Sequence, residues 1–504
     1  MSPNFQTDRP VPSYVATRRL FLRLVGVVYL IAFWSIGWQV DGLFGSRGIE
    51  PAARFLEEAR PQLGAWPFLR VPTIFWWLGA SDATLHAVCT IGMVEAGALI
   101  AGFFPLPILA LLWLLYQSLV AVGSPFLQFQ WDALLLETGF LAILWAPATW
   151  RLGSPNARAP SPIILFLIRC LLFRLMFFSG WVKLASGDEV WWNLTALEYH
   201  YWTQPLPTWT SWYANLLPGA AQRLCCAGMF AIELGLPFLI FAPRRARRVA
   251  AAGFVLFQLL IAATGNYGFF NLLAAALCVP LLDDEIFARR RPAPTPPPRP
   301  PLVVKRWLDL GVAVLLLALA LPLSWRQLTG TSSPADRALA PYTSWLRPFH
   351  VVNPYGLFAV MTRTRPELEI AGSDDGVTWR SYDFRWKPGP LDGAPAFVEP
   401  DMPRLDWQMW FDGLGVERML GAGRGGYGLV TPALLDRLAE GSPEVLALLG
   451  GNPFPNAPPR LLRWSLYQYR FTDAAERRAT GHWWKRELVH TQNFSRGPKS
   501  PDDS

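Results

Sequence analysis

The long apolar runs of this 504-residue chain constrain its fold most, because several of them reach the length needed to cross a membrane. A transmembrane helix requires about 20 mostly apolar residues. Hydrophobic residues make up 52% of the chain and charged residues only 16%, which argues against disorder and against a wholly soluble enzyme. We therefore expect a polytopic α-helical membrane domain with about nine spans, at residues 20–40, 83–104, 107–122, 132–150, 162–182, 223–241, 248–264, 268–282 and 304–325.

Clusters of basic residues indicate how these spans are oriented. Lys and Arg concentrate in the cytoplasmic loops of membrane proteins. If nine spans alternate, the arginines before the first span, the 244–248 cluster and the stretch 289–306 all fall on one side. The chain is then divided into a cytoplasmic N-terminus (1–19), a transmembrane domain (20–325) and a domain outside the cytoplasm (326–504).

Charged residues inside the apolar runs are a second signal, because an unpaired charge within a bilayer is costly. A rise of about 1.5 Å per residue places Arg174 and Glu137 in the outer half of the membrane, and Arg169 and Glu95 in the inner half. Arg174–Glu137 and Arg169–Glu95 are therefore predicted pairs, and Glu233 lies in the sixth run. These residues either form ion pairs that fix helix packing or line a polar cavity that holds a ligand or a reaction centre.

The stretch that follows the fifth run, 184–222, is dense in Trp and Tyr. Aromatic rings with a polar tip favour the boundary between membrane and water, so we expect an interfacial loop here. Lys183 lies at its start. Its ammonium group either extends along the helix end to the interface or acts between apolar helices as a general base. The sequence favours the first interpretation.

The last third of the chain has the composition of a soluble domain. Alternating residues predict strands, and the turn residues 373–376 join two of them into a hairpin. A β-rich, sandwich-like α+β domain is expected. It contains no metal-ligand spacing, no Ser/His/Asp arrangement and no cysteine, so we expect neither a metal nor a cofactor. The predicted strands are 368–373, 378–386 and 461–471, and the predicted helices are 409–420 and 431–449.

One segment of this domain is rich in the residue types found at protein interfaces. Trp, Met and Arg are enriched at interface cores, and Trp and Arg dominate binding hot spots. The segment is either a binding surface for a client protein or part of the domain core, with Arg404 and Asp406 as an internal ion pair. The candidate binding residues are Arg404, Asp406, Trp407, Gln408, Trp410 and Phe411.

Several long motifs of the chain resemble the lipase maturation factor family. In the C-terminal third they are Asn353-Pro354-Tyr355-Gly356-Leu357-Phe358, 372–379 and 404–411, and in the membrane half they are 179–183 and 197–207. The family's animal members are endoplasmic-reticulum membrane proteins that help secreted lipases to fold and assemble. The resemblance implies the same role here, with the plasma membrane as the equivalent location in a cell without that organelle.

The membrane part also resembles the transmembrane domain of vitamin K-dependent gamma-glutamyl carboxylases. Their Gly-x-x-Lys-Leu stretch carries a lysine base, and Gly180-Trp181-Val182-Lys183-Leu184 matches it. The resemblance thus implies a catalytic role for Lys183. However, where the carboxylases have Trp-Asn-x-His, this chain has Trp131-Asp132-Ala133-Leu134, so the histidine is absent.

Two functional hypotheses follow. The first is a non-enzymatic membrane maturation factor whose partners are membrane lipids and secreted client proteins, with lipases implied by the resemblance. The second is a membrane enzyme that uses Lys183 and the buried acids on a lipid-soluble or peptide substrate. Nucleic acid is not an expected partner, because the basic residues lie in short runs between apolar segments.

Overall fold

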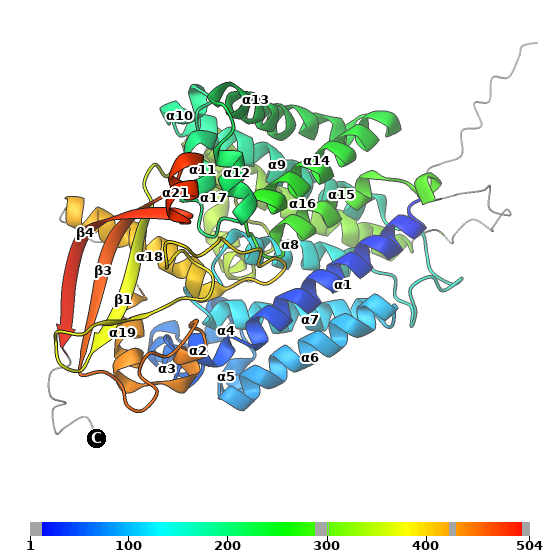
Figure 1. The fold of residues 1–504 in the computed structure, drawn as a ribbon. Helices are drawn as coiled ribbons and strands as arrows, with labels where there is room; N and C mark the ends of the chain where they lie inside the picture. Colours follow the sequence, from blue (N-terminus) through cyan, green and yellow to red (C-terminus); the bar gives the residue numbers. More distant parts are fainter. Residues whose placement is uncertain (1–12, 288–299, 301, 423–429, 496–504) are drawn as a thin grey trace, which may run out of the picture.

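The computed structural model describes residues 13–287, 300, 302–422 and 430–495. A bundle of long helices forms one end of the molecule and a small sheet forms the other (Figure 1). We call residues 13–329 the helical half and residues 330–495 the C-terminal region. Among the described residues, seven helical segments are long and apolar enough to cross a membrane: α1 (Val15–Gly37), α6 (Asp82–Ala101), α7 (Pro105–Val122), α9 (Pro162–Ala185), Gly219–Phe241, α14 (Arg244–Thr264) and α16 (Val303–Thr329).

All nine predicted runs are helical, but two of the helices fall short of spanning length. They are α8 (Gln130–Trp145) and α15 (Phe270–Cys278). Helix α8 stops before Pro147, because a residue that precedes proline is kept out of the helical conformation. Helix α15 passes into a 3₁₀ turn, η3 (Val279–Leu281), that contains Pro280. Seven of the described segments therefore reach spanning length, and the two further passages of the prediction are not confirmed.

The sixth predicted run is irregular in the middle. Helix α13 (Gly219–Phe230) continues as a π-helical turn, η1 (Ala231–Gly235), and then as a 3₁₀ stretch, η2 (Leu236–Phe241). π-Turns within helices are rare, and those that occur are often found at functional sites. It carries Glu233 inward, toward α9.

Short helices fill the loops between the long ones. They lie at the end of the bundle that faces the sheet, apart from η4, which follows α15 (Figure 1). They are α2 (Val40–Phe44), α3 (Ala52–Leu63), α4 (Pro67–Arg70), α5 (Phe75–Leu78), α10 (Glu189–Trp192), α11 (Leu197–Thr203), α12 (Trp209–Asn215), η4 (Asp284–Phe287), α17 (Pro334–Thr343) and η5 (Ser344–Phe349).

The described residues of the C-terminal region form one antiparallel sheet of order β2-β1-β3-β4. Helix α18 packs on β1 and β3, so one helical layer covers the sheet where the sandwich prediction required a second sheet; no second sheet occurs among the described residues. The strands are β1 (Pro366–Ser373), β2 (Arg380–Tyr382), β3 (Leu461–Phe471) and β4 (Trp484–Ser495). The helices are α18 (Arg404–Ala422), α19 (Thr431–Glu440), α20 (Pro443–Leu446) and α21 (Ala474–Thr480).

Two local predictions for this region need correction. The second strand of the hairpin is only three residues long, because the Asp375 carboxylate accepts hydrogen bonds from the N–H groups of Val377 and Thr378 and extends the turn. The predicted helix 431–449 is divided after Glu440, where Gly441 adopts the left-handed conformation at φ +67°.

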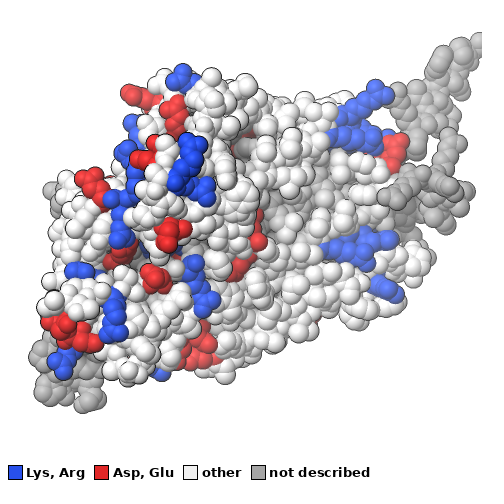
Figure 2. All heavy atoms as spheres, in the orientation of Figure 1, with Lys and Arg blue, Asp and Glu red and all other residues white. Residues whose placement is uncertain are grey.

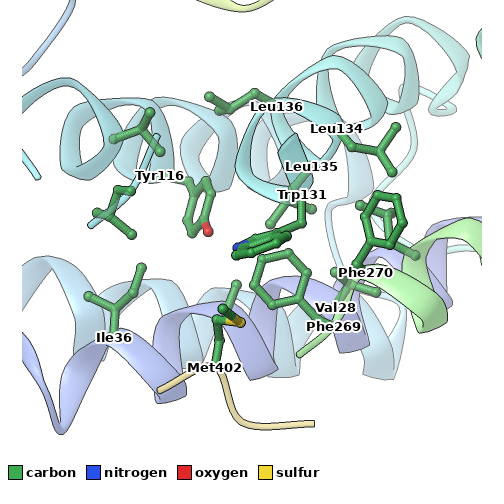
Figure 3. Close-up of a cluster of buried hydrophobic side chains, with 14 of the residues drawn as sticks. Val28, Ile36, Tyr116, Trp131, Leu134, Leu135, Leu136, Phe269, Phe270 and Met402 are labelled. Atoms are coloured by element: carbon green, nitrogen blue, oxygen red, sulfur yellow. The ribbon is translucent and has the colours of Figure 1, made fainter. Parts of the chain in front are cut away.

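The hydrophobic core is continuous between the two parts of the molecule. Figure 3 shows Met402, from the loop before α18, among side chains of the helical half. Gly268, at φ +60°, makes room for this loop, since a Cβ there would lie 2.8 Å from the Met402 sulfur. The other labelled side chains of this cluster are Val28, Ile36, Tyr116, Trp131, Leu134, Leu135, Leu136, Phe269 and Phe270.

Candidate functional site

The strongest polar feature of the molecule lies where the C-terminal region meets the helical half. Arg174 of α9 donates a 2.7 Å hydrogen bond to the Glu137 carboxylate of α8, the pairing that the sequence predicts. The other Glu137 oxygen accepts from the backbone N–H of Asn353 at 2.8 Å and from the Tyr355 hydroxyl at 2.8 Å. Arg174 also donates to the Asn353 carbonyl. A predicted pair within the bundle is therefore part of the contact between the two parts.

A second buried ion pair joins the same two parts. Arg404, which is 0% exposed at the start of α18, donates from both terminal nitrogens to the Asp132 carboxylate at 2.7 and 2.8 Å. One of these nitrogens also reaches the carbonyl of Phe126 at 3.0 Å, and the Tyr116 hydroxyl donates to Asp132 at 2.6 Å. A bidentate guanidinium–carboxylate pair with additional partners is among the strongest polar contacts in proteins.

The candidate client-binding segment, 404–411, thus lies inside the molecule, in contact with the helical half and with the rest of the C-terminal region. Its side chains are buried or half-buried, so they offer little surface to another protein. The Asp406 carboxylate accepts from the N–H groups of Trp386 and Lys387, and burial raises its pKa to about 6. The remaining members contact the helical half or α18 itself: Trp407 packs on Trp131, Gln408 donates to Asp412, Trp410 donates to the Thr203 carbonyl and Phe411 stacks on Phe129.

A third contact involves the aromatic loop 184–222. Arg365, which is fully buried beside β1, donates to the carbonyls of Trp202 and Pro205 at 2.9 and 2.8 Å. Its guanidinium also pairs with Glu367 at 2.8 Å. The Trp212 indole donates to the Thr472 carbonyl at 2.8 Å. Part of this loop therefore packs against the C-terminal region, although the exposed Trp192 and Trp209 leave part of it available to an interface.

We call these contacts the polar seam, defined by the Arg174–Glu137 pair, the Arg404–Asp132 pair and Arg365 with the loop carbonyls. Sequence reasoning missed most of it. The sequence marks Asp132 only as a departure from the carboxylase motif, and Arg365 directly precedes β1 without any such signal. Smaller contacts at the ends of the long helices extend the seam: Ser35 and Gln39 with the 401–404 loop, and Asn266 with the 396–399 loop.

Lys183 lies outside the polar seam, within the helical half. Its ammonium group is buried and lies 2.8 and 3.0 Å from the two carboxylate oxygens of Glu233, and it also donates to the Ser179 carbonyl at 2.8 Å. It therefore does not extend to the interface. A general base must be neutral and reach a substrate proton. An ammonium held by a buried carboxylate meets neither condition, so the geometry does not favour the catalytic hypothesis.

The other predicted pair, Arg169–Glu95, does not form. Arg169 donates instead to the Pro280 carbonyl at 3.0 and 3.2 Å and to the Tyr14 hydroxyl at 3.1 Å. Glu95 has no hydrogen-bond or ion-pair partner among the described residues. Depth along each helix places two residues at one level but does not tell which helices are neighbours, and α6 packs mainly on α1 and α7 and not on α9.

No group of three or more His, Cys, Asp or Glu side chains close enough to bind a metal occurs in the described part of the chain. Each carboxylate and guanidinium group of the seam has an ion-pair partner, although the Nε atoms of Arg365 and Arg404 have no hydrogen-bond partner among the described residues. The role of this arrangement is structural: it holds the C-terminal region in one fixed position on the ends of the long helices.

These features define an integral membrane protein with two interlocked parts, a bundle of apolar helices and a small sheet domain fixed to one end of it. Residues 16–289 match the family described as lipase maturation factor transmembrane domain, and residues 351–494 match the lipase maturation factor C-terminal domain. The chain therefore belongs to the lipase maturation factor family.

Curated relatives match nearly the whole chain. Lipase maturation factor 2 of Homo sapiens is 36% identical over 94% of this chain and 81% of its own length. The corresponding protein of Gallus gallus is 35% identical over 95% and 80%. Lipase maturation factor 1 of Mus musculus is 30% identical over 94% and 86%. No solved structure shows a significant match to the chain.

Proposed function

We propose that this protein is a membrane-bound maturation factor that assists the folding and assembly of secreted lipases. Its relatives carry the name lipase maturation factor, and they match both of its parts in order. The observation that carries the proposal is the polar seam, because it fixes a small sheet domain on one end of a membrane bundle. Such a domain is held close to the membrane across which a client emerges. The setting is the endoplasmic reticulum in a eukaryote and the plasma membrane in a bacterium.

The same proposal includes a topology of nine passages with the N-terminus in the cytoplasm. Basic side chains gather at the end of the bundle away from the sheet, and the middle of the visible face is almost free of charge (Figure 2). Contacts at that end bring together chain segments from several turns: Asp284 with Thr17, Arg169 with Pro280, and Arg158 with Pro300. Helix α8 packs on α1, α7 and α9, and α15 packs on α1, α9 and α14, so both lie within the bundle of long helices, which supports counting them as passages.

Clients are proposed to bind at the outer edge of β4. This strand is last in the sheet, so one of its backbone edges has no neighbour among the described strands. Leu488 and Val489 lie in its middle and are 55% and 50% exposed, next to a register shift in the β3–β4 ladder. An open strand edge with exposed apolar side chains can accept an extended segment of another chain by backbone hydrogen bonding.

Site-specific photocrosslinking tests this function directly. A photoreactive residue at position 488 or 489 should crosslink to a secreted lipase that is expressed in the same cell and is still folding. The control position is Val377, which is 83% exposed in the turn before β2 at the other edge of the sheet. Equal crosslinking from all three positions would refute β4 as the binding site, and unchanged yield of active lipase in cells that lack the protein would refute the function.

A further inference from the structure

A pocket of about 230 Å³ lies beside the C-terminal end of α16, between that helix and the α17–η5 segment. Its wall on α16 consists of Ala318, Leu319, Pro322 and Leu323, and Arg326 follows them. These residues are spaced by three or four positions, so they share one face of the helix. From Ala318 to Arg326 this face is apolar over about 12 Å along the helix axis, at about 1.5 Å per residue.

The charge of the pocket comes from two arginines. Arg326 and Arg347 both line it and are exposed, and neither has a hydrogen-bond or ion-pair partner for its side chain among the described residues. The described lining contains no carboxylate. Thr343, His350 and Asn353 complete the polar part of the lining, and burial lowers the pKa of the His350 ring, which favours its uncharged form.

The pocket lies at the level expected for the boundary between membrane and water. Arg326 lies in the last turn of a helix of spanning length. The aromatic side chains of Trp325, Tyr342 and Trp345 are exposed around it, and residues of this type are enriched at both surfaces of a bilayer. An apolar helix face therefore ends in a pair of unpaired guanidinium groups at the level of the lipid head groups.

We propose that this pocket binds an anionic phospholipid, with its phosphate between Arg326 and Arg347 and an acyl chain along the 318–323 face of α16. Guanidinium groups bind phosphate oxygens in a directed manner, and two of them without a carboxylate partner at the same pocket attract an anion. The apolar wall identifies the source as a lipid, because free phosphate would leave that wall unused. The inference is independent of the lipase-related function.

Native mass spectrometry of the full-length protein tests the proposal. The protein is purified from bilayers that contain equal amounts of phosphatidylglycerol and phosphatidylcholine. We expect at least one phosphatidylglycerol to be retained roughly tenfold more often than phosphatidylcholine, the ratio that about 1.4 kcal/mol of selectivity produces. Arg326→Gln or Arg347→Gln should remove most of this preference, whereas Arg326→Lys, which keeps the charge, should preserve part of it.

Arg306→Gln is the matched control, because Arg306 is an exposed arginine at the other end of the same helix. It should leave the retained lipid unchanged. An equal loss in Arg306→Gln and Arg326→Gln would show general attraction of anionic lipid and overturn the site, as would equal retention of the two lipids by the parent protein. Displacement of the bound lipid by inorganic phosphate at millimolar concentration would overturn the lipid as its occupant. All variants are exposed substitutions, so their melting temperatures should match that of the parent.

Discussion

At the scale of single residues, the Glu137 carboxylate accepts four hydrogen bonds in the polar seam. It accepts from Arg174, from the backbone and side chain of Asn353, and from Tyr355. Glu137→Gln removes the charge and leaves the Arg174 guanidinium buried without a counterion, which costs about 3–5 kcal/mol. We expect a clearly lower free energy of unfolding in detergent. Glu95→Gln serves as the control because Glu95 has no partner among the described residues, and a similar loss in that variant would contradict the explanation.

A residue-scale prediction for pH concerns Glu399, in the loop that leads to Met402. It accepts from the Tyr267 N–H at 2.7 Å and from the Asn271 amide at 3.0 Å, yet burial raises its pKa to about 7. The folded protein thus holds a proton that the unfolded chain, with a pKa of about 4.3, releases earlier. Stability from this group is complete below the lower pKa and is lost as the pH rises through the higher one.

We therefore expect the melting temperature to fall between about pH 4 and pH 7, and to fall less in Glu399→Gln, which does not titrate. Thermal denaturation of the two proteins across this range measures the difference. Asp392→Asn, an exposed carboxylate of the same loop, should keep the slope of the parent. A parent and a Glu399→Gln variant with identical slopes would show that Glu399 does not control this dependence.

The individual residues also show how far the sequence predicts the site. Arg174 and Glu137 were identified because charges inside apolar runs require partners, and helix rise placed them at one level. Arg404 and Asp132 could not be paired in this way, since one lies in a soluble-looking segment and the other at a helix start. Their meeting depends on how the C-terminal region sits on the bundle, which no local pattern encodes. A signal was present, however: the cluster of Trp and Arg at 404–411 predicts burial as readily as binding.

At the scale of elements, the contact between α9 and the π-turn η1 depends on Gly180. A Cβ at this position would lie 2.9 Å from the Glu233 Cβ and 2.9 Å from a Leu234 methyl. Gly180→Ala should therefore separate the two elements and weaken the Lys183–Glu233 pair, lowering the free energy of unfolding by about 1–3 kcal/mol. Gly228→Ala in α13 is the control, because nothing lies within 4 Å of its Cβ position and alanine favours a helix. Equal stability of the two variants would disprove the close approach.

Element prediction succeeded where apolar length alone decides the structure and failed where single residues interrupt it. The long helices were found from their apolar runs. The ends of α8 and α15 depend on Pro147 and Pro280, and the π-turn around Glu233 has no sequence signature. The sheet was expected as a sandwich because its strands alternate, but alternation shows only that one face is covered. Here the cover is α18, a helix.

At the scale of the whole molecule, the two parts share one core and one set of buried charges, so neither is complete alone. Met402 lies among helices of the bundle, and Arg404 and Arg365 have buried partners in the helical half. The sheet must therefore lie on the same side of the membrane as the helix ends that it contacts. The start of α8, near Asp132, and the end of α9, near Lys183, are on the same side as β4.

The number of passages determines on which side of the membrane each loop lies, and cysteine labelling can measure it. The labelling uses a Cys225→Ser background, because Cys225 is the exposed native thiol among the described residues. With nine passages and a cytoplasmic N-terminus, Asn156 faces the cytoplasm and Val377 the outside. A maleimide that cannot cross membranes should therefore label Val377→Cys in intact cells and Asn156→Cys only after permeabilisation. Both positions are exposed, so access within the protein does not limit the reaction.

If only the seven long helices crossed the membrane, both ends of α8 would lie on the outer side. Asn156→Cys would then react in intact cells as readily as Val377→Cys. Labelling of Asn156→Cys alone in intact cells would reverse the whole orientation and place β4, with its open edge, in the cytoplasm.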